Sequence, residues 1–225
     1  MDYMKQNLNP TFIENFKQAY TKLFNLHPQI EDASFNLRYL RVDWFFPQHI
    51  NNVLLQILEI NKLYFNTEVD LEICLFAGLF HDAGLVYKRK SANPKRHEDR
   101  SIEYAEIELE RFGYNPDFIN KVSECIKSTK PDYISESPEA LVVRNADAYA
   151  HIISMHFFAK SNFSNDIYSF VKWFNNKLDI TVHKITIHEL QQNISPLIES
   201  YRKMLENYSA RDKDKVDFID KFLTF

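Results

Sequence analysis

Two adjacent polar residues, His81 and Asp82, directly follow the apolar run Leu75–Phe80. The run is typical of a buried helix, and Gly84 stands where a left-handed C-cap would end that helix. A carboxylate buried beside an imidazole is costly unless it is paired, hydrogen-bonded or bound to a metal ion. Both side chains can ligate metals, so the pair points first to a metal site.

Two more residues, on separate predicted helices, are candidates for the same site. His49 lies in the first turn of a helix predicted over 47–63, one residue before its apolar stripe. Asp147 lies in the middle of a helix predicted over 139–160, between two alanines that leave room around a ligand. Taken alone, such residues more often serve as packed histidines or salt-bridge partners. Metal sites in helical bundles, however, are built from side chains on several facing helices.

The elements that must position these residues are helical. Apolar residues recur at helical spacing along most of the chain, and prolines or Gly113 mark the interruptions. We therefore predict an all-α fold, a single-domain helical bundle over residues 1–225. The predicted helices begin at Pro10 and then cover 47–63, 68–83, 97–112, 117–128, 139–160, 167–178, 187–208 and 213–223, with an irregular basic segment over 86–100.

Composition argues against several other classes of protein. Glycine occurs only three times, well below the roughly 7% average, which disfavours a glycine-rich phosphate loop or a dinucleotide fingerprint. A net charge of -4 gives no electrostatic reason to expect nucleic acid or an anionic membrane as a partner. Two cysteines are too few for a disulfide framework, and neither a signal peptide nor a membrane span is recognisable. We expect a reduced, cytoplasmic protein.

The order of a histidine, a His-Asp pair and a distant aspartate on separate helices resembles the HD-domain metal-dependent phosphohydrolase superfamily. The resemblance is closest to a bacterial branch of predicted HD phosphohydrolases. His97-Glu98-Asp99-Arg100-Ser101 stands where that branch has Asn-Glu-Glu-x-Ser-Ala, and Ile126-Lys127-Ser128-Thr129 stands where it has Ile-x-x-Thr. The motif-bearing core covers about 43–152, and residues 160–225 form a helical C-terminal extension.

Two phrases depart from the pattern of that branch. Trp44-Phe45-Phe46 replaces an aromatic-His-Asn phrase, and Lys130-Pro131-Asp132 replaces a histidine after Ile-x-x-Thr. The four metal positions survive both changes. The departures motivate an alternative function, a catalytically silent HD-fold module that binds a nucleotide or a partner. A di-iron oxygenase on the same scaffold is a third interpretation, for which His97 is the one well-placed additional histidine.

The resemblance implies that His49, His81, Asp82 and Asp147 hold one divalent metal ion. Mixed nitrogen and oxygen donors suit Mn²⁺, Fe²⁺, Co²⁺, Ni²⁺ or Mg²⁺. A metal-activated water would then hydrolyse a phosphate ester or anhydride of a small molecule such as a nucleotide, with Asp82 as a ligand at the reacting centre. Glu98 falls on the glutamate of the family phrase and is the candidate general acid/base. The competing interpretation of Glu98 is a first-turn carboxylate that favours the helix dipole.

Basic residues near the His-Asp pair are candidates for substrate binding. Lys88 and Arg96 belong to the basic segment, which would hold a phosphate or be a solvated loop. Arg41 precedes His49 by eight residues and is a further phosphate contact. His97 is assigned to the substrate phosphate or to a second metal, as the third histidine is in some HD proteins, or to no chemistry. The expected partner is a small phosphorylated substrate, with no nucleic acid or membrane, and a homodimer is compatible with the sequence.

Two later histidines receive no chemical role from the sequence. His151 follows Asp147 by one helical turn and is interpreted as a packed histidine or a second-layer partner. His156 shows no spacing that indicates a function.

Overall fold

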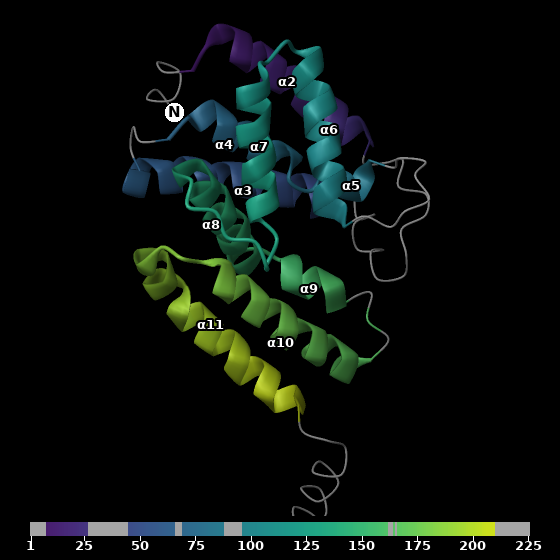
Figure 1. Cartoon of the computed structure of the whole chain (residues 1–225). Helices are drawn as coiled ribbons and strands as arrows, with labels where there is room; N and C mark the ends of the chain where they lie inside the picture. Colours follow the sequence, from purple (N-terminus) through teal and green to yellow (C-terminus); the bar gives the residue numbers. More distant parts are fainter. Residues whose placement is uncertain are drawn as a thin grey trace, which may run out of the picture.

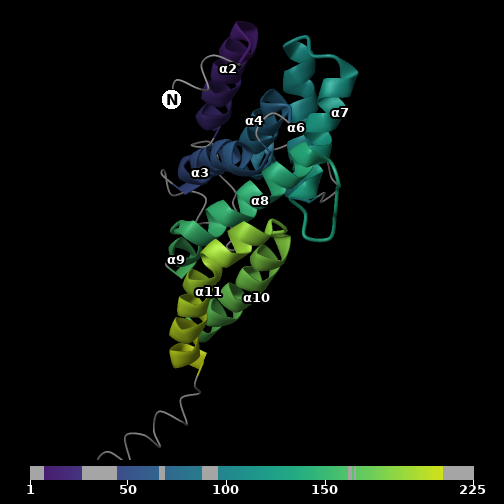
Figure 2. The same ribbon diagram turned by 90° about the vertical axis from the view of Figure 1, so that its left-hand side faces the viewer.

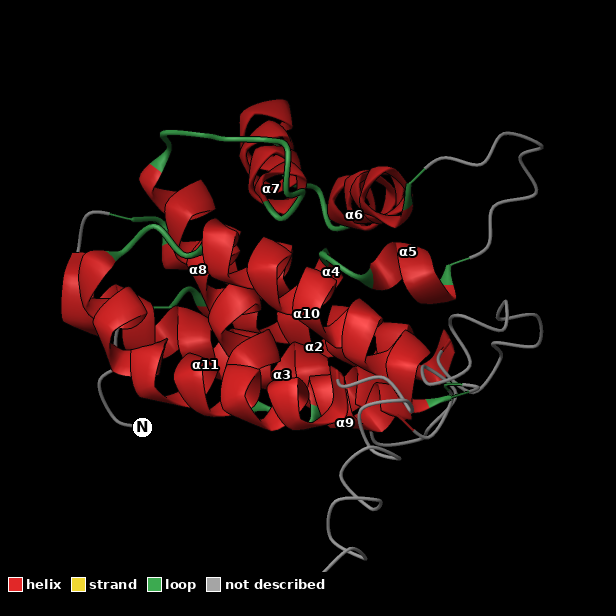
Figure 3. Cartoon of the chain, turned by 90° about the horizontal axis from the view of Figure 1, so that it is seen from below, coloured by secondary structure: helices red, strands yellow, loops and turns green. Residues whose placement is uncertain are grey.

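The computed structural model describes residues 8–26, 45–65, 69–87, 96–161, 164 and 166–209. Every regular element in these residues is a helix, as Figures 1 and 3 show, so the predicted all-α bundle is confirmed. The helix predicted over 213–223 lies outside the described residues. The elements are α2 (Pro10–Leu26), α3 (Phe45–Ile60), the π-helix η3 (Asn61–Phe65), α4 (Leu71–Phe80), α5 (Ala83–Val86), α6 (His97–Arg111), α7 (Pro116–Ser128), α8 (Pro138–Ile153), α9 (His156–Ser161), α10 (Ile167–Lys184) and α11 (His188–Ser209).

Helix α4 is the centre of the bundle. All residues from Ile73 to Phe80 are buried, and α2, α3, α6, α7 and α8 pack around them. The Asp70 side chain caps the start of the helix by accepting hydrogen bonds from the backbone N–H groups of Glu72 and Ile73. Burying each large apolar side chain contributes about 1.5–3 kcal/mol. The end of α4 is therefore held firmly inside the protein, and that end carries His81 and Asp82.

Gly84 does not end α4, and the predicted left-handed C-cap is wrong. Helix α4 passes through His81 with right-handed helical angles, and the short helix α5 begins at Ala83. Among the described glycines, positive φ is recorded for Gly113. A Cβ on Gly84 would lie 2.0 Å from the backbone oxygen of His97. The glycine is needed because α5 packs closely against the start of α6, which is a tertiary contact and not a chain reversal.

The helix predicted over 139–160 is broken into α8 and α9. Helix α8 ends at Ile153, and α9 begins at His156. The hydroxyl of Ser154 accepts a hydrogen bond from the backbone N–H of His156 at 3.2 Å, in place of the helical pattern. Serine competes for backbone groups in this way and favours helix starts over helix interiors. The break gives His156 a position that a continuous helix would not give it.

Helices α10 and α11 lie side by side next to α8 (Figures 1 and 2). Helix α10 continues to Lys184, past the predicted end at residue 178. The side chain of Asn145 in α8 fixes the turn after α10, because its oxygen accepts hydrogen bonds from the N–H groups of Thr186 at 2.8 Å and Ile187 at 3.2 Å. In the described part of the chain, no helix has the length and apolar character required to cross a membrane.

Candidate metal centre

The four residues predicted as metal ligands meet at one point. The Nε2 atoms of His49 in α3 and His81 at the end of α4 are 3.2 Å apart. Asp147 Oδ1 in α8 lies 3.4 Å from the first of these nitrogens and 3.6 Å from the second. Asp82 Oδ2 lies 3.6 Å from His49 Nε2 and 3.5 Å from His81 Nε2. Two nitrogens and two carboxylate oxygens thus surround a common centre.

This geometry fits a divalent cation. Nitrogen and oxygen ligands that share an ion at about 2.0–2.2 Å lie roughly 3–3.5 Å from one another. Asp147 Oδ1, which faces the centre, is buried and forms no hydrogen bond with the described residues, although His151 Nδ1 lies 3.0 Å from it. His81 Nδ1 lies 2.8 Å from the backbone oxygen of Gly78, to which it donates, so its Nε2 lone pair is directed at the centre. A cation at the centre would give this buried carboxylate oxygen the partner that the protein does not supply.

Neighbouring charges keep the two carboxylates ionised. Burial alone would raise the pKa of Asp82, but nearby imidazoles, His81 first among them, hold it well below its ordinary value. Burial would likewise raise the pKa of Asp147, but the ammonium group of Lys184 lowers it. Ionised carboxylates are the form that binds metals. Burial also lowers the pKa of His151 to about 3, so this ring is neutral at physiological pH.

Helix α10 supplies two lysines that the sequence prediction missed. Lys184 Nζ forms a buried ion pair with Asp147 Oδ2, on the side of the carboxylate that faces away from the donor cluster. Lys177 lines the same cavity, and burial lowers the pKa of its ammonium group. Ile180 lies between them on one face of the helix. The spacing of these three residues places them on one face of a helix and could have been read from the sequence. Lysines on such a face are usually solvated, so the spacing alone does not indicate a cavity.

The predicted residues at the start of α6 reach the centre through Asp82. His97 Nε2 lies 3.3 Å from Asp82 Oδ1, the oxygen not directed at the other donors. Burial alone would lower the pKa of His97, but its hydrogen bond to Asp82 raises it. Glu98 is 8% exposed, and its Oε2 atom lies 3.4 Å from His97 Nδ1. Asp82 therefore connects the metal ligands to His97 and Glu98.

These groups line a cavity of about 160 Å³. Phe46 and Thr129 border it. Pro131, which belongs to the Lys130-Pro131-Asp132 phrase, borders it as well. Pro131 brings no ligand to the site. The cavity is lined by Phe46, His49, His81, Asp82, Leu85, His97, Glu98, Thr129, Pro131, Asp147, His151, His156, Lys177, Ile180 and Lys184.

Of the predicted basic contacts, the structure describes Arg96 alone. Arg96 lies at the surface, where its Nη1 atom pairs with Asp132 Oδ1 at 3.0 Å, and it is not among the residues that line the cavity. Arg41 and Lys88 lie outside the described residues, as does Trp44 of the departing aromatic phrase. Among the described residues, the lysines that line the cavity are Lys177 and Lys184 of α10.

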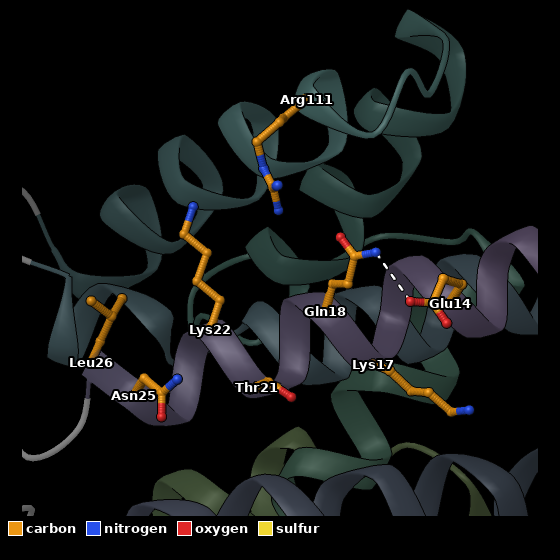
Figure 4. A pocket seen from close by; sticks show the side chains of 8 residues that line it. All are labelled: Glu14, Lys17, Gln18, Thr21, Lys22, Asn25, Leu26 and Arg111. Carbon is orange, nitrogen blue, oxygen red and sulfur yellow. Dashed lines mark hydrogen bonds between the residues drawn. The ribbon is translucent and has the colours of Figure 1, made fainter.

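A separate hollow of about 590 Å³ lies between α2 and α6 (Figure 4). Two of its three cations, Lys22 and Arg111, pair with the buried carboxylate of Glu108. Gln18 donates a hydrogen bond to Glu14 at 3.2 Å along the rim. Because these charges are paired with each other and no histidine lines the hollow, it offers no metal-binding chemistry.

Comparison with known proteins identifies the class to which this site belongs. Residues 48–152 match the model of the HD-domain family. Residues 48–152 thus carry an HD domain, which confirms the resemblance seen in the sequence. The matched segment contains all four donors as well as His97 and Glu98. It ends before α9 and α10, so Lys177 and Lys184 come from outside it.

A solved structure with a similar fold is that of Bacillus subtilis YpgQ in complex with ADP. The TM-score is 0.57 and the sequence identity is 20%, over 88% of this chain and 96% of the YpgQ chain. The likeness thus extends to the C-terminal helices and concerns the fold. No curated protein matches this chain at a significant level of sequence similarity.

Proposed function

We propose that this protein is a metal-dependent phosphohydrolase that cleaves a phosphate ester or anhydride of a small molecule, in the first instance a nucleotide. The observation that carries the proposal is the convergence of four metal-type donors in a cavity whose other wall presents Lys177. The match to the HD-domain family supports the hydrolase class. The ADP in the YpgQ complex supports a nucleotide as the first ligand to test.

His49, His81, Asp82 and Asp147 would hold the divalent ion, and their mixed donors suit Mn²⁺, Fe²⁺, Co²⁺, Ni²⁺ or Mg²⁺. When bound, such an ion supplies Lewis-acid chemistry, because it polarises a phosphoryl oxygen and lowers the pKa of water. The chain contributes the fixed ligand geometry. The Gly78 carbonyl orients the His81 ring, and the Lys184 ammonium orients Asp147.

Proton transfer falls to the residues at the start of α6. Glu98 Oε2 is buried without a hydrogen-bond partner among the described residues and lines the cavity, so it is available to accept a proton from the attacking water. His97, whose pKa the hydrogen bond to Asp82 raises, would favour the negative charge of a phosphate beside it when it is protonated. Lys177 adds a second positive charge against the phosphate.

The size of the cavity limits what can enter it. Pockets that enclose whole small ligands usually measure about 300–1,000 Å³, whereas this cavity measures about 160 Å³. It therefore suits the phosphoryl end of a substrate, with the remainder of the molecule outside the described walls. A terminal phosphate is a better fit than an internal phosphodiester.

The direct test is a phosphate-release assay. Metal-free protein is loaded with Mn²⁺, Co²⁺ or Mg²⁺ and offered nucleoside mono-, di- and triphosphates together with simple phosphate monoesters. We expect wild-type protein to release phosphate or pyrophosphate and Glu98→Gln to bind the ion but turn over at least about 100-fold more slowly. Equal release by wild type and His81→Ala across all metals would contradict the proposal.

A catalytically silent binding module is the second candidate. It is favoured by Pro131, which stands near the cavity where a related branch carries histidine, and by Lys184, which already neutralises part of Asp147. Thermal unfolding with each nucleotide separates the two functions. A nucleotide that raises Tm without being cleaved under any metal supports the module and contradicts the hydrolase.

A further inference from the structure

Two histidines at the site have no part in the proposed hydrolysis. His151 in α8 and His156 at the start of α9 lie beside His49, and the three side chains are each at least nine-tenths buried. Ring centroids are 4.3 Å apart for His49 and His151 and 4.1 Å apart for His151 and His156. One ring nitrogen from each of the three lies within 4.8 Å of the others. Three imidazoles from three helices thus face one small volume.

The hydrogen bonds determine which nitrogens are available. His151 Nδ1 lies 2.8 Å from the backbone oxygen of Asp147, so it carries the proton and leaves the lone pair on Nε2. His49 directs Nε2 to the four-donor centre. The other ring nitrogen of His49, Nδ1, is buried and has no hydrogen-bond partner in the described parts of the chain. The His49 ring therefore presents a donor atom that the four-donor centre does not use.

A second cavity reaches two of the three histidines. It measures about 540 Å³ and is lined by His49 and His156 together with Gln48, Asn52 and Ser154. His49 and His156 also line the cavity of about 160 Å³ that contains the four donors. These two rings thus stand between the cavities. An ion in the larger cavity could therefore meet His49 and His156 without passing the four-donor centre.

We propose that His49, His151 and His156 form a second cation site, built from three imidazoles, for a nitrogen-preferring ion such as Zn²⁺, Ni²⁺ or Cu²⁺. Imidazole suits these ions, whereas carboxylate donors suit Mg²⁺ and Mn²⁺. A neutral imidazole has one lone pair, so His49 serves one ion at a time. Occupation of the three-histidine site therefore withdraws His49 from the four-donor centre. The consequence for turnover rests on the proposed function, but the site itself does not.

Metal binding without turnover tests the site. The double variant His81→Ala, Asp82→Asn keeps the three histidines and removes half of the four-donor centre. We expect the metal-free double variant to bind one Zn²⁺ per chain in a calorimetric titration. Adding His156→Gln should weaken that binding by about tenfold or more, whereas adding His183→Gln, at an exposed histidine of α10, should leave it unchanged. Zn²⁺ affinity that is absent from the double variant, or unaffected by His156→Gln, overturns the proposal.

Competition in the unmodified centre provides a second measurement, in case the double variant does not fold. Protein loaded with Mn²⁺ is titrated with Zn²⁺ while released Mn²⁺ is followed by electron paramagnetic resonance. Release from His156→Gln should need about tenfold more Zn²⁺ than release from wild type or His183→Gln. Identical release curves overturn the second site. Absence of phosphate release with these shifts intact would contradict the hydrolase proposal alone.

Discussion

The two walls of the four-donor cavity differ in chemistry and in origin. The wall formed by α3, α4 and α8 carries imidazoles and carboxylates, and it lies within the segment that matches the HD-domain family. The wall formed by α10 carries Lys177 and Lys184 and lies outside that segment. The first wall has the donors to hold an ion, and the second has the charge to hold an anion. The family segment therefore contains the proposed metal ligands but not all the groups proposed to meet a substrate.

Removing one ligand from the wall formed by α3, α4 and α8 should have the largest effect on metal binding and on phosphate release. His81→Ala deletes a ligand that its hydrogen bond to Gly78 holds in place, and we expect loss of the ion and a fall in phosphate release of about 10⁴-fold, equivalent to several kcal/mol. Metal content and turnover measure both effects. His183→Ala, at an exposed histidine, is the matched control. Full metal content in His81→Ala would show that the donor wall is not the metal site.

Lys184→Met should lower the free energy of unfolding and so test how the two walls depend on each other. The change leaves the Asp147 carboxylate buried without its lysine, and breaking a buried ion pair by removing one partner costs about 3 kcal/mol or more. Urea unfolding with a chelator present measures this loss. Added Mn²⁺ should raise Tm more in the variant than in wild type, because the ion replaces the missing charge. Lys172→Met, at an exposed lysine of α10, should behave like wild type.

Lys177→Met tests whether the second wall binds the anion. The lost contact is one charge-assisted hydrogen bond to phosphate, worth about 1.5–3 kcal/mol, so kcat/KM should fall about ten- to a hundredfold while the metal content stays at the wild-type level. Lys172→Met again serves as the control on the same helix. A variant that loses its metal as well as kcat/KM would show that Lys177 supports metal binding. It would contradict the separate roles of the two walls.

Arg96→Ala should have the smallest effect. Arg96 is exposed and pairs with an exposed aspartate, and such surface pairs contribute about 1 kcal/mol or less. We expect kcat/KM to change by less than about threefold. A loss comparable to that of Lys177→Met would restore the substrate role that the sequence indicates for Arg96, and it would extend the anion-binding wall to the start of α6.

The four metal-type residues of the wall formed by α3, α4 and α8 could be predicted because short sequence patterns mark them. His81 and Asp82 interrupt an apolar run, and the order of the donors along the chain matches a family pattern. The second wall depends on packing. Lys177 and Lys184 have the spacing of an ordinary solvated face, and only the contact of α10 with α8 buries them. The four donors could thus be named in advance, whereas the lysines could not.

Two of the errors in the helix predictions, at Gly84 and at His156, have the same origin. Gly84 looked like a helix end because glycine favours turns, but its real constraint is the backbone of His97, which is distant in sequence. His156 had no visible role because the predicted helix was continuous, and the hydrogen bond from its N–H to Ser154 breaks that helix. In both cases a contact that periodicity does not report decides the local structure.

The Asn145 side chain has a consequence for how this chain can be divided. It stands two residues before Asp147 and holds the backbone N–H groups that follow Lys184. A fragment cut at residue 152, where the family match ends, would keep the four donors His49, His81, Asp82 and Asp147. It would lose the partner of Asp147 and expose the face of α8 that α10 covers. A fragment that keeps the ion pair of Asp147 and the covered face of α8 must therefore be longer than the segment that matches the HD-domain family.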